Sequence, residues 1–190
     1  MELGPLVSAF VLILVTELGD KTMFAVITLS SRYSKLIVLI GALSALALVT
    51  AVGVLIGEVI YQLVPQFWLQ IGAATLFLIF GVYTLVTHEN GSGEEMKFQK
   101  WGGGVATFGM VALMELGDKS QLSVIALSAE SGAPLMVFIG TMLAFAIITT
   151  IMVLLGEQIG RRVPEKYIRL GSGAIFIIFG LIFMVQAIIS

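Results

Sequence analysis

Two nearly identical hexapeptides place charged side chains inside otherwise apolar parts of this sequence. ELGDKT occupies residues 17–22 and ELGDKS occupies residues 115–120. Residues three and four apart share one face of a helix, so each Glu would lie beside the Asp and the Lys that follow it. The four carboxylates and two ammonium groups of these motifs could bind a cation, carry protons or pair with one another.

The chain around the motifs is too apolar for a soluble domain. Of its 190 residues, 58% are hydrophobic and 12% charged, and the mean hydropathy is +1.08. Soluble domains are about 25% charged, and a membrane span needs about 20 apolar residues. We therefore predict an all-α membrane protein with six transmembrane helices, at roughly 6–30, 36–61, 66–87, 103–128, 134–159 and 166–189.

Both motifs fall near the middle of a predicted span. Glu17 and Glu115 lie about 11 and 12 residues inside their spans, roughly 17 Å into a hydrocarbon core about 30 Å thick. One charge there costs about 2.5–3.5 kcal/mol, so six unpaired charges would cost on the order of 15–20 kcal/mol, more than a typical domain's stability. The charges must pair with each other, with water or with an ion. A purely structural role is the weaker alternative, because buried ion pairs often stabilise no better than apolar side chains.

The motifs belong to an internal duplication. They are 98 residues apart, and later matches keep a spacing of 99, as between Gly41 and Gly140 or between LFLIFG (76–81) and IFIIFG (175–180). Three spans per copy is an odd number, so the second copy enters the membrane from the opposite side, as in the inverted repeats of many secondary transporters. We predict a first three-helix repeat at 1–87, a linker at 88–102 and a second, inverted repeat at 103–190.

Charge outside the motifs predicts the orientation. Eight of the ten basic residues lie in loops on one predicted face: Arg32, Lys35, Lys97, Lys100, Arg161, Arg162, Lys166 and Arg169. The positive-inside rule makes this face and the central linker cytoplasmic, with both termini outside. The first span follows no basic segment, so we expect it to be retained rather than cleaved. The compact chain is typical of a protein of the prokaryotic inner (plasma) membrane.

The charge balance and the ligand types favour a hard cation. With all six motif groups ionised, four negative and two positive charges leave −2, which one divalent cation or two protons would neutralise. Oxygen ligands suit Ca²⁺, Mg²⁺ and Mn²⁺, whereas cysteine is absent and the single His88 lies in the linker. The candidate metal ligands are Glu17, Asp20, Glu115 and Asp118; the candidate supporting or charge-compensating residues are Lys21, Thr22, Lys119, Ser120 and Gln121.

Two further acidic residues end spans 2 and 5, each directly after a glycine. Glu58 and Glu157 are equivalent under the 99-residue spacing. In an inverted repeat they would lie near opposite membrane faces. They are candidate gate residues, and the alternative is that each belongs to a solvated helix end.

The pattern E-x-G-D-K-[T/S], present twice in two three-span halves, resembles a family of small transmembrane cation/proton antiporters. That family includes Golgi, thylakoid and bacterial manganese or calcium transporters, and both copies here match its pattern without departure. The resemblance implies exchange of Mn²⁺ or Ca²⁺ for protons, with the four motif carboxylates as carriers. Mn²⁺ is the first choice by this resemblance and Ca²⁺ the second; no resident cofactor and no nucleic-acid partner are expected, and the oligomeric state is left open.

Export of the metal from the cytoplasm by alternating access is the expected activity. Two other transport activities stay open on the sequence: export of small cationic organic molecules such as amino acids, and conduction through a cation channel. The sequence offers no activated nucleophile and no histidine-based metal pair, so we do not expect an enzyme.

Overall fold

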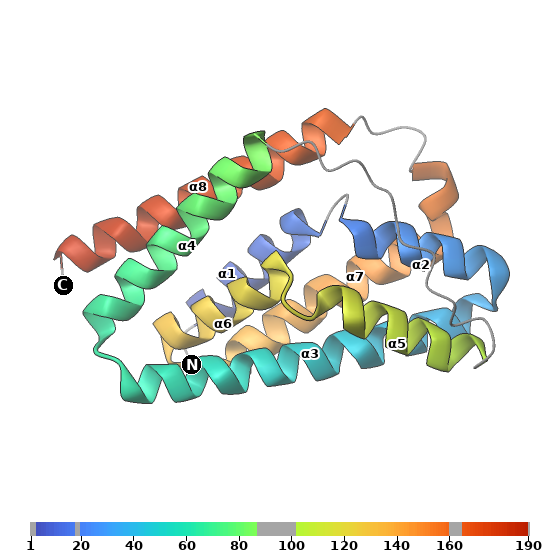
Figure 1. Ribbon diagram of the computed structural model, residues 1–190, viewed down its shortest axis with the longest axis horizontal. Coiled ribbons are helices and arrows are strands. Elements are labelled where there is room, and N and C mark those ends of the chain that lie inside the picture. Colours follow the sequence, from blue (N-terminus) through green and yellow to red (C-terminus); the bar gives the residue numbers. More distant parts are fainter. Residues whose placement is uncertain (1–2, 18–19, 87–101, 160–164, 190) are drawn as a thin grey trace.

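The computed structural model describes residues 3–17, 20–86, 102–159 and 165–189, and all regular structure in these ranges is helical (Figure 1). This confirms the all-α class. The helices are α1 (Gly4–Thr16), α2 (Lys21–Arg32), α3 (Lys35–Leu63), α4 (Gln66–Val86), α5 (Gly103–Glu115), α6 (Lys119–Ser131), α7 (Pro134–Ile159) and α8 (Glu165–Ile189).

Four of the six predicted spans form single helices, namely α3, α4, α7 and α8. The first and fourth do not: each is a pair of shorter helices, α1 with α2 and α5 with α6, so the prediction of one continuous helix was wrong at both motifs. Among the described residues, three helices have segments long and apolar enough to cross a membrane, Lys35–Leu63, Gln66–Tyr83 and Pro134–Leu154. Shorter apolar segments lie at Gly4–Thr16, Gly103–Glu115 and Phe176–Ile189.

The helix breaks have a local cause in the motifs themselves. Asp20 and Asp118 adopt extended backbone, with ψ of 162° and 166°, and each stands directly before a new helix. Gly117 has a φ of +81°, a left-handed conformation that costs glycine little. Aspartate is favoured at helix N-caps because its carboxylate can accept from free backbone N–H groups. The charged motif therefore lies at a break between two helices and not along one face of a single helix.

Contacts between helices distinguish two ends of the molecule. Tyr33, at the end of α2, lies against Gly103 at the start of α5, and Lys35 Nζ donates to the carbonyl of Leu154 on α7. We call this the Arg32 end. At the other, Tyr61 end, Tyr61 of α3 lies against Gly132, which follows α6. Helix α1 begins at the Tyr61 end and α5 at the Arg32 end (Figure 1).

The first helix of each half packs on the third helix of the other half. Gly41 of α3 faces the backbone carbonyl of Gly104 on α5, and Gly140 of α7 faces the carbonyl of Leu6 on α1. These two contacts correspond under the repeat spacing, since Gly41 and Gly140 are 99 residues apart and Leu6 and Gly104 are 98 apart. A side chain at either glycine would meet backbone, so glycine permits the close approach.

Helices α4 and α8 form a separate layer that lies against the others (Figure 1). Phe77 and Phe176, both fully buried, stack with ring centroids 5.9 Å apart. They are repeat equivalents, and Phe179 and Phe183 extend the same aromatic cluster. Stacked and tilted rings at such distances add to the stabilisation from burial alone.

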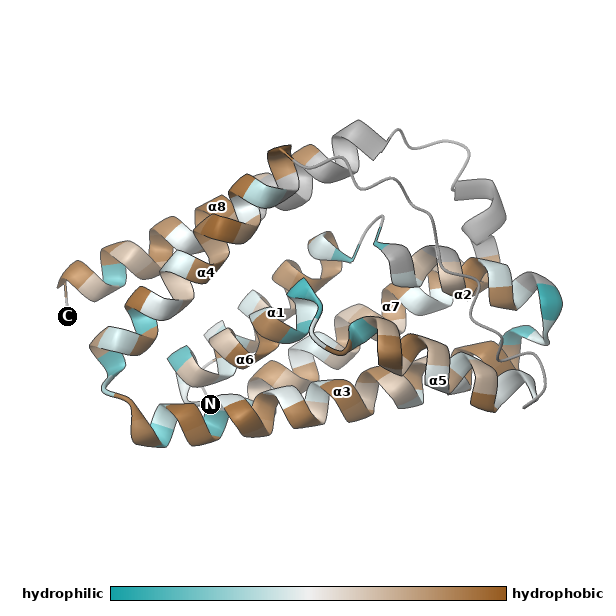
Figure 2. Ribbon diagram, in the orientation of Figure 1, coloured by the Kyte–Doolittle hydropathy of each residue, from teal (hydrophilic) through white to brown (hydrophobic). Residues whose placement is uncertain are grey.

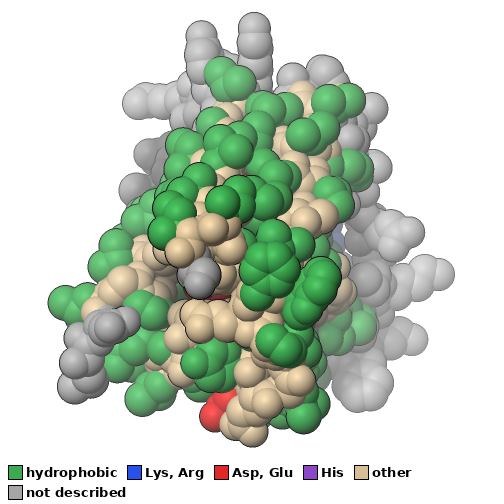
Figure 3. Space-filling view, turned by 90° about the vertical axis from the view of Figure 1, so that its left-hand side faces the viewer, with side chains coloured by type: hydrophobic (Ala, Val, Ile, Leu, Met, Phe, Trp, Pro, Cys, Tyr) green, Lys and Arg blue, Asp and Glu red, His purple; other side chains and the backbone are tan. Residues whose placement is uncertain are grey.

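Apolar side chains also cover the outside of the molecule. Figure 2 shows hydrophobic residues along the helices and hydrophilic ones near the helix breaks and turns, and hydrophobic side chains dominate the face in Figure 3. Large residues such as Leu36 and Leu63 are 66% and 77% exposed. Exposed apolar surface on this scale is what a lipid bilayer covers, so the chain is a membrane protein.

A substitution at Gly140 tests the close approach of α7 to α1. The added Cβ of Gly140→Ala would lie 3.0 Å from the carbonyl carbon of Leu6, so we expect a loss of about 1–3 kcal/mol in stability. Gly72→Ala is the matched control, since a Cβ there meets nothing within 4 Å and alanine is the better helix former. Thermal unfolding in detergent should show a lowered Tm for Gly140→Ala alone. Equal melting of the two variants would contradict the packing.

Candidate cation site

The helix breaks place the acidic residues of each motif at helix ends. Glu17 directly follows α1, and Asp20 directly precedes α2. In the second motif Glu115 is the last residue of α5, and Asp118 caps α6. Helix C-termini carry partial negative charge and N-termini partial positive charge. The partial positive charge of the following helix favours both Asp carboxylates, and Asp118 alone of the two also accepts a capping hydrogen bond in the described structure. Each Glu, in contrast, is held at a helix end that disfavours an isolated anion.

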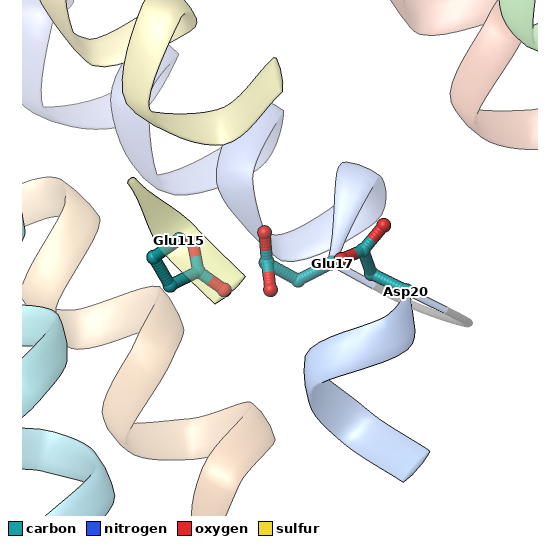
Figure 4. Close-up of side chains that lie close together, drawn as sticks. All are labelled: Glu17, Asp20 and Glu115. Carbon is teal, nitrogen blue, oxygen red and sulfur yellow. The ribbon is translucent and has the colours of Figure 1, made fainter. Parts of the chain in front are cut away.

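Three of the four candidate carboxylates meet in one cluster. Glu17, Asp20 and Glu115 are 2%, 6% and 1% exposed, and each offers a carboxylate oxygen within 4.8 Å of the other two. Figure 4 shows Glu115 and Glu17 extending toward each other from different helix ends, with Asp20 on the far side of Glu17. Three buried carboxylates at this spacing repel one another unless a cation or protons compensate them.

The two glutamates differ in their hydrogen bonds. Each carboxylate oxygen of Glu115 accepts one hydrogen bond: Thr22 Oγ1 donates to Oε1 at 2.6 Å and Ser120 Oγ donates to Oε2 at 2.9 Å. Glu17 Oε1 is buried and has no hydrogen-bond partner within the described part of the chain. Buried polar atoms are almost always paired, so the free oxygen of Glu17 marks a point where a ligand can be accepted.

Contacts across the repeat connect the two motifs. Thr22 belongs to the first motif but donates to Glu115 of the second. Lys119 belongs to the second motif, and its Nζ lies 2.7 Å from Oδ1 of Asp20 in the first. Each motif therefore supplies a partner for a carboxylate of the other motif, and neither half of the chain could form this arrangement alone.

The remaining predicted residues surround the cluster or fall outside it. Asp118 is half-buried and is not one of the three clustered carboxylates; its Oδ2 accepts from the backbone N–H of Ser120 at 3.4 Å. Gln121 Oε1 accepts from the N–H of Gly117 at 2.6 Å, which holds the turn between α5 and α6. Gln121 thus supports the backbone, and its direct contact with a metal stays a prediction.

The candidate gate residues lie apart from the cluster or have side chains outside the described structure. Glu58 is half-buried on α3 and is not part of the carboxylate cluster. The side chains of Glu157 and Lys21 lie outside the described part of the structure. Their predicted roles stay predictions.

Two small cavities adjoin the cluster and contain residues that the motifs did not indicate. Thr149 of α7 lines a cavity with Glu17 and Thr22, and Thr50 of α3 lines another with Glu115 and Ser120. The two threonines are 99 residues apart, which is the spacing of the repeat. This spacing could have indicated the two threonines from the sequence alone, but threonines are too common in apolar helices for the match to be distinctive.

Buried carboxylates between broken membrane helices are typical of ion-coupled secondary transporters. Residues 5–92 and 104–190 match the family described as Divalent cation/proton antiporter GDT1. The chain belongs to this family, which places it among transport proteins and not among enzymes. The match confirms the family resemblance drawn from the repeated motif.

Named relatives extend over almost the whole chain. GDT1-like protein 1, chloroplastic, of Oryza sativa subsp. indica is 32% identical over 96% of this chain, which spans 62% of that relative's length. GDT1-like protein sll0615 of Synechocystis sp. is 32% identical, with 92% of this chain and 94% of the relative covered. Protein PAM71, chloroplastic, of Arabidopsis thaliana is 31% identical over 95% of this chain and 56% of its own length. No solved structure matches the chain.

The hydrogen bond between the motifs can be tested by Thr22→Val. The variant keeps the shape of the side chain but removes the donor to buried Glu115, so we expect a loss of about 1.5–3 kcal/mol in stability. Thr75→Val is the matched control, because Thr75 is exposed on α4 and donates to Ile71 of its own helix. Thermal unfolding of both variants at neutral pH is the measurement. A Thr22→Val protein as stable as the control would count against the contact.

Proposed function

We propose that this protein is a secondary active transporter that exchanges a divalent cation for protons by alternating access. The observation that carries the proposal is the cluster of Glu17, Asp20 and Glu115, buried between broken helices and drawn from both motifs. Within it, a cation would be held by the two glutamates and Asp20, with Asp118 close to the same charges. Carboxylates that lose the cation regain protons, because burial and like charge favour the neutral form.

The proposal includes an inverted repeat. Its support is the correspondence of contacts under the repeat spacing: Gly41 with α5 and Gly140 with α1, and the stacking of Phe77 on Phe176. The opposite starting ends of α1 and α5 agree with it. Two such halves with a site between them can rock about that site and open it to each side in turn.

Lys119 provides a means of compensating charge when no metal is bound. Its ammonium group contacts Asp20 at 2.7 Å and is only partly exposed, at 23% of its side chain. A divalent cation in the cluster would compete with Lys119 for the same carboxylate and repel it. We propose that Lys119 holds Asp20 in the metal-free carrier and moves away when the cation binds.

Manganese is the first choice of cargo and calcium the second. The ligands on offer are carboxylate and hydroxyl oxygens, which both ions accept. The preference for Mn²⁺ comes from the family resemblance, while the ligand set excludes neither ion. Movement out of the cytoplasm follows if an inward proton gradient drives the exchange.

We propose that the protein lies in the inner membrane and that its Arg32 end faces the cytoplasm. Arg32 and Lys35 are exposed at that end, as the positive-inside rule requires of cytoplasmic loops. Both termini would then be outside and the linker at 88–102 inside.

Neutralising the carboxylates tests the site. Glu17→Gln and Asp118→Asn should each lower proton-driven Mn²⁺ transport in reconstituted vesicles at least 100-fold, because each removes a charge that compensates the cation. Both variants should still insert and elute as folded protein. Glu130→Gln, near the end of α6, is the control and should transport normally. Near-normal flux in both site variants would refute the assignment.

Proton coupling is tested by ion-dependent proton release from vesicles, scanned across Mn²⁺, Ca²⁺ and Mg²⁺. Addition of the transported ion should release protons in a saturable manner, and a protonophore should abolish uphill movement of the metal. Uphill transport that persists with the protonophore would argue against an antiporter. Single-channel currents would instead identify a pore, and competition by lysine an exporter of organic cations.

A further inference from the structure

We propose that Thr50 and Thr149 contact the transported cation, each on one side of the carboxylate cluster. The inference rests on the proposed exchange of a divalent cation and extends it to two residues outside the motifs. Thr149 would contact the cation between the cluster and the Arg32 end, and Thr50 would contact it between the cluster and the Tyr61 end.

Both threonines are buried in the centres of long apolar helices. Thr50 lies on α3 and is 3% exposed, and Thr149 lies on α7 and is 5% exposed. Some other threonines in the described helices donate to their own backbone, as Thr75 does to Ile71 and Thr107 to Gly103. In the described residues, Thr50 and Thr149 make no such bond. Thr141 of α7 is also buried and has no partner among the described residues, but it lines neither of the two cavities beside the cluster. A buried hydroxyl without that bond can still serve a ligand.

The first cavity connects Glu17 with Thr149. Its lining continues along α2 to Val26 and along α7 to Met152. Both helices run from the cluster toward the Arg32 end, so this cavity lies on that side of the carboxylates. It combines a motif from the first half of the chain with a threonine from the second.

The second cavity connects Glu115 with Thr50. It is also lined by Ser120, Gln121 and Val124 of α6, and α6 and α3 both run from the cluster toward the Tyr61 end. This cavity combines the motif of the second half with a threonine of the first. It is therefore the counterpart of the first cavity under the repeat spacing, on the opposite side of the cluster.

The two cavities have two apolar lining residues in common. Leu46 and Phe145 line both, and they too are 99 residues apart. Beyond Thr50, α3 closes on α6, where Ser128 Oγ donates to the carbonyl of Val54 and Gly57 faces Ser128. The path toward the Tyr61 end is thus shut beyond its threonine.

The chemistry of a hydroxyl suits this position. A divalent cation that leaves carboxylates in an apolar channel must replace their oxygens one at a time. A neutral hydroxyl is an oxygen ligand that binds a hard cation without holding it as tightly as a carboxylate does. Leu46 and Phe145 offer no side-chain oxygen, and the amide oxygen of Gln121 already accepts from Gly117. Each cavity therefore has one hydroxyl ligand outside the motifs, Thr149 in the first and Thr50 in the second.

The test compares Thr149→Val and Thr50→Val in vesicles of one orientation, with Mn²⁺ as the probe and Ca²⁺ as the second ion. Thr149→Val should raise the half-saturating cation concentration about tenfold at the Arg32 face and leave the other face unchanged. Thr50→Val should do the reverse. Thr149→Ser and Thr50→Ser keep the hydroxyl and should behave as the wild type, and Thr75→Val should have no effect. If a valine variant fails to fold, alanine at the same position replaces it.

The outcomes separate this inference from the proposed function. If the wild-type protein exchanges neither ion for protons, the proposed function fails and takes the inference with it. If it does exchange them but the valine variants match the wild type, only the role of the threonines is overturned. The same holds if either variant weakens both faces equally or if serine fails to restore affinity, since those results indicate a packing role.

Discussion

The cost of charge inside a membrane is the constraint on which the rest of this structure depends. Glu17, Asp20 and Glu115 are almost completely buried, and their oxygens lie within 4.8 Å of one another. Such a group is stable only if cations or protons neutralise it. Part of the compensation is built in, since Lys119 reaches Asp20 and two hydroxyls satisfy Glu115. Among the described residues, Oε1 of Glu17 has no hydrogen-bond partner, and a cation or a proton could supply the missing one.

The helix breaks are what bring these groups together. A continuous helix would spread Glu, Asp and Lys along one face of a span, with every backbone group paired internally. The breaks at Asp20 and Asp118 expose free helix ends in the middle of the molecule, and such ends interact with charges of both signs. Close packing around them depends on glycines such as Gly41 and Gly140, which let the helices of one half approach the backbone of the other.

The contacts of the site cross between the two halves of the chain. Thr22 donates a hydrogen bond to Glu115, and Lys119 forms a salt bridge with Asp20. Each cavity is lined by residues of one motif and by a threonine of the other half. Any movement of one half against the other would therefore change the distances between these candidate ligands. That linkage is what alternating access requires, because occupancy of the site and the relative position of the halves then depend on each other.

The sequence by itself determined the membrane class, the duplication, four of the helices almost to the residue and the family to which the chain belongs. These follow from local composition, periodicity and a motif repeated at a constant spacing. It also singled out the four carboxylates, because charge in an apolar span has few explanations. Only the tertiary structure decided that both motif spans are broken, that Gln121 holds a turn, that Lys119 pairs across the repeat, and that Thr50 and Thr149 face the cluster. Those facts depend on which side chains of distant helices meet, and residues 93 or 99 apart carry no mark of that meeting until the chain is folded.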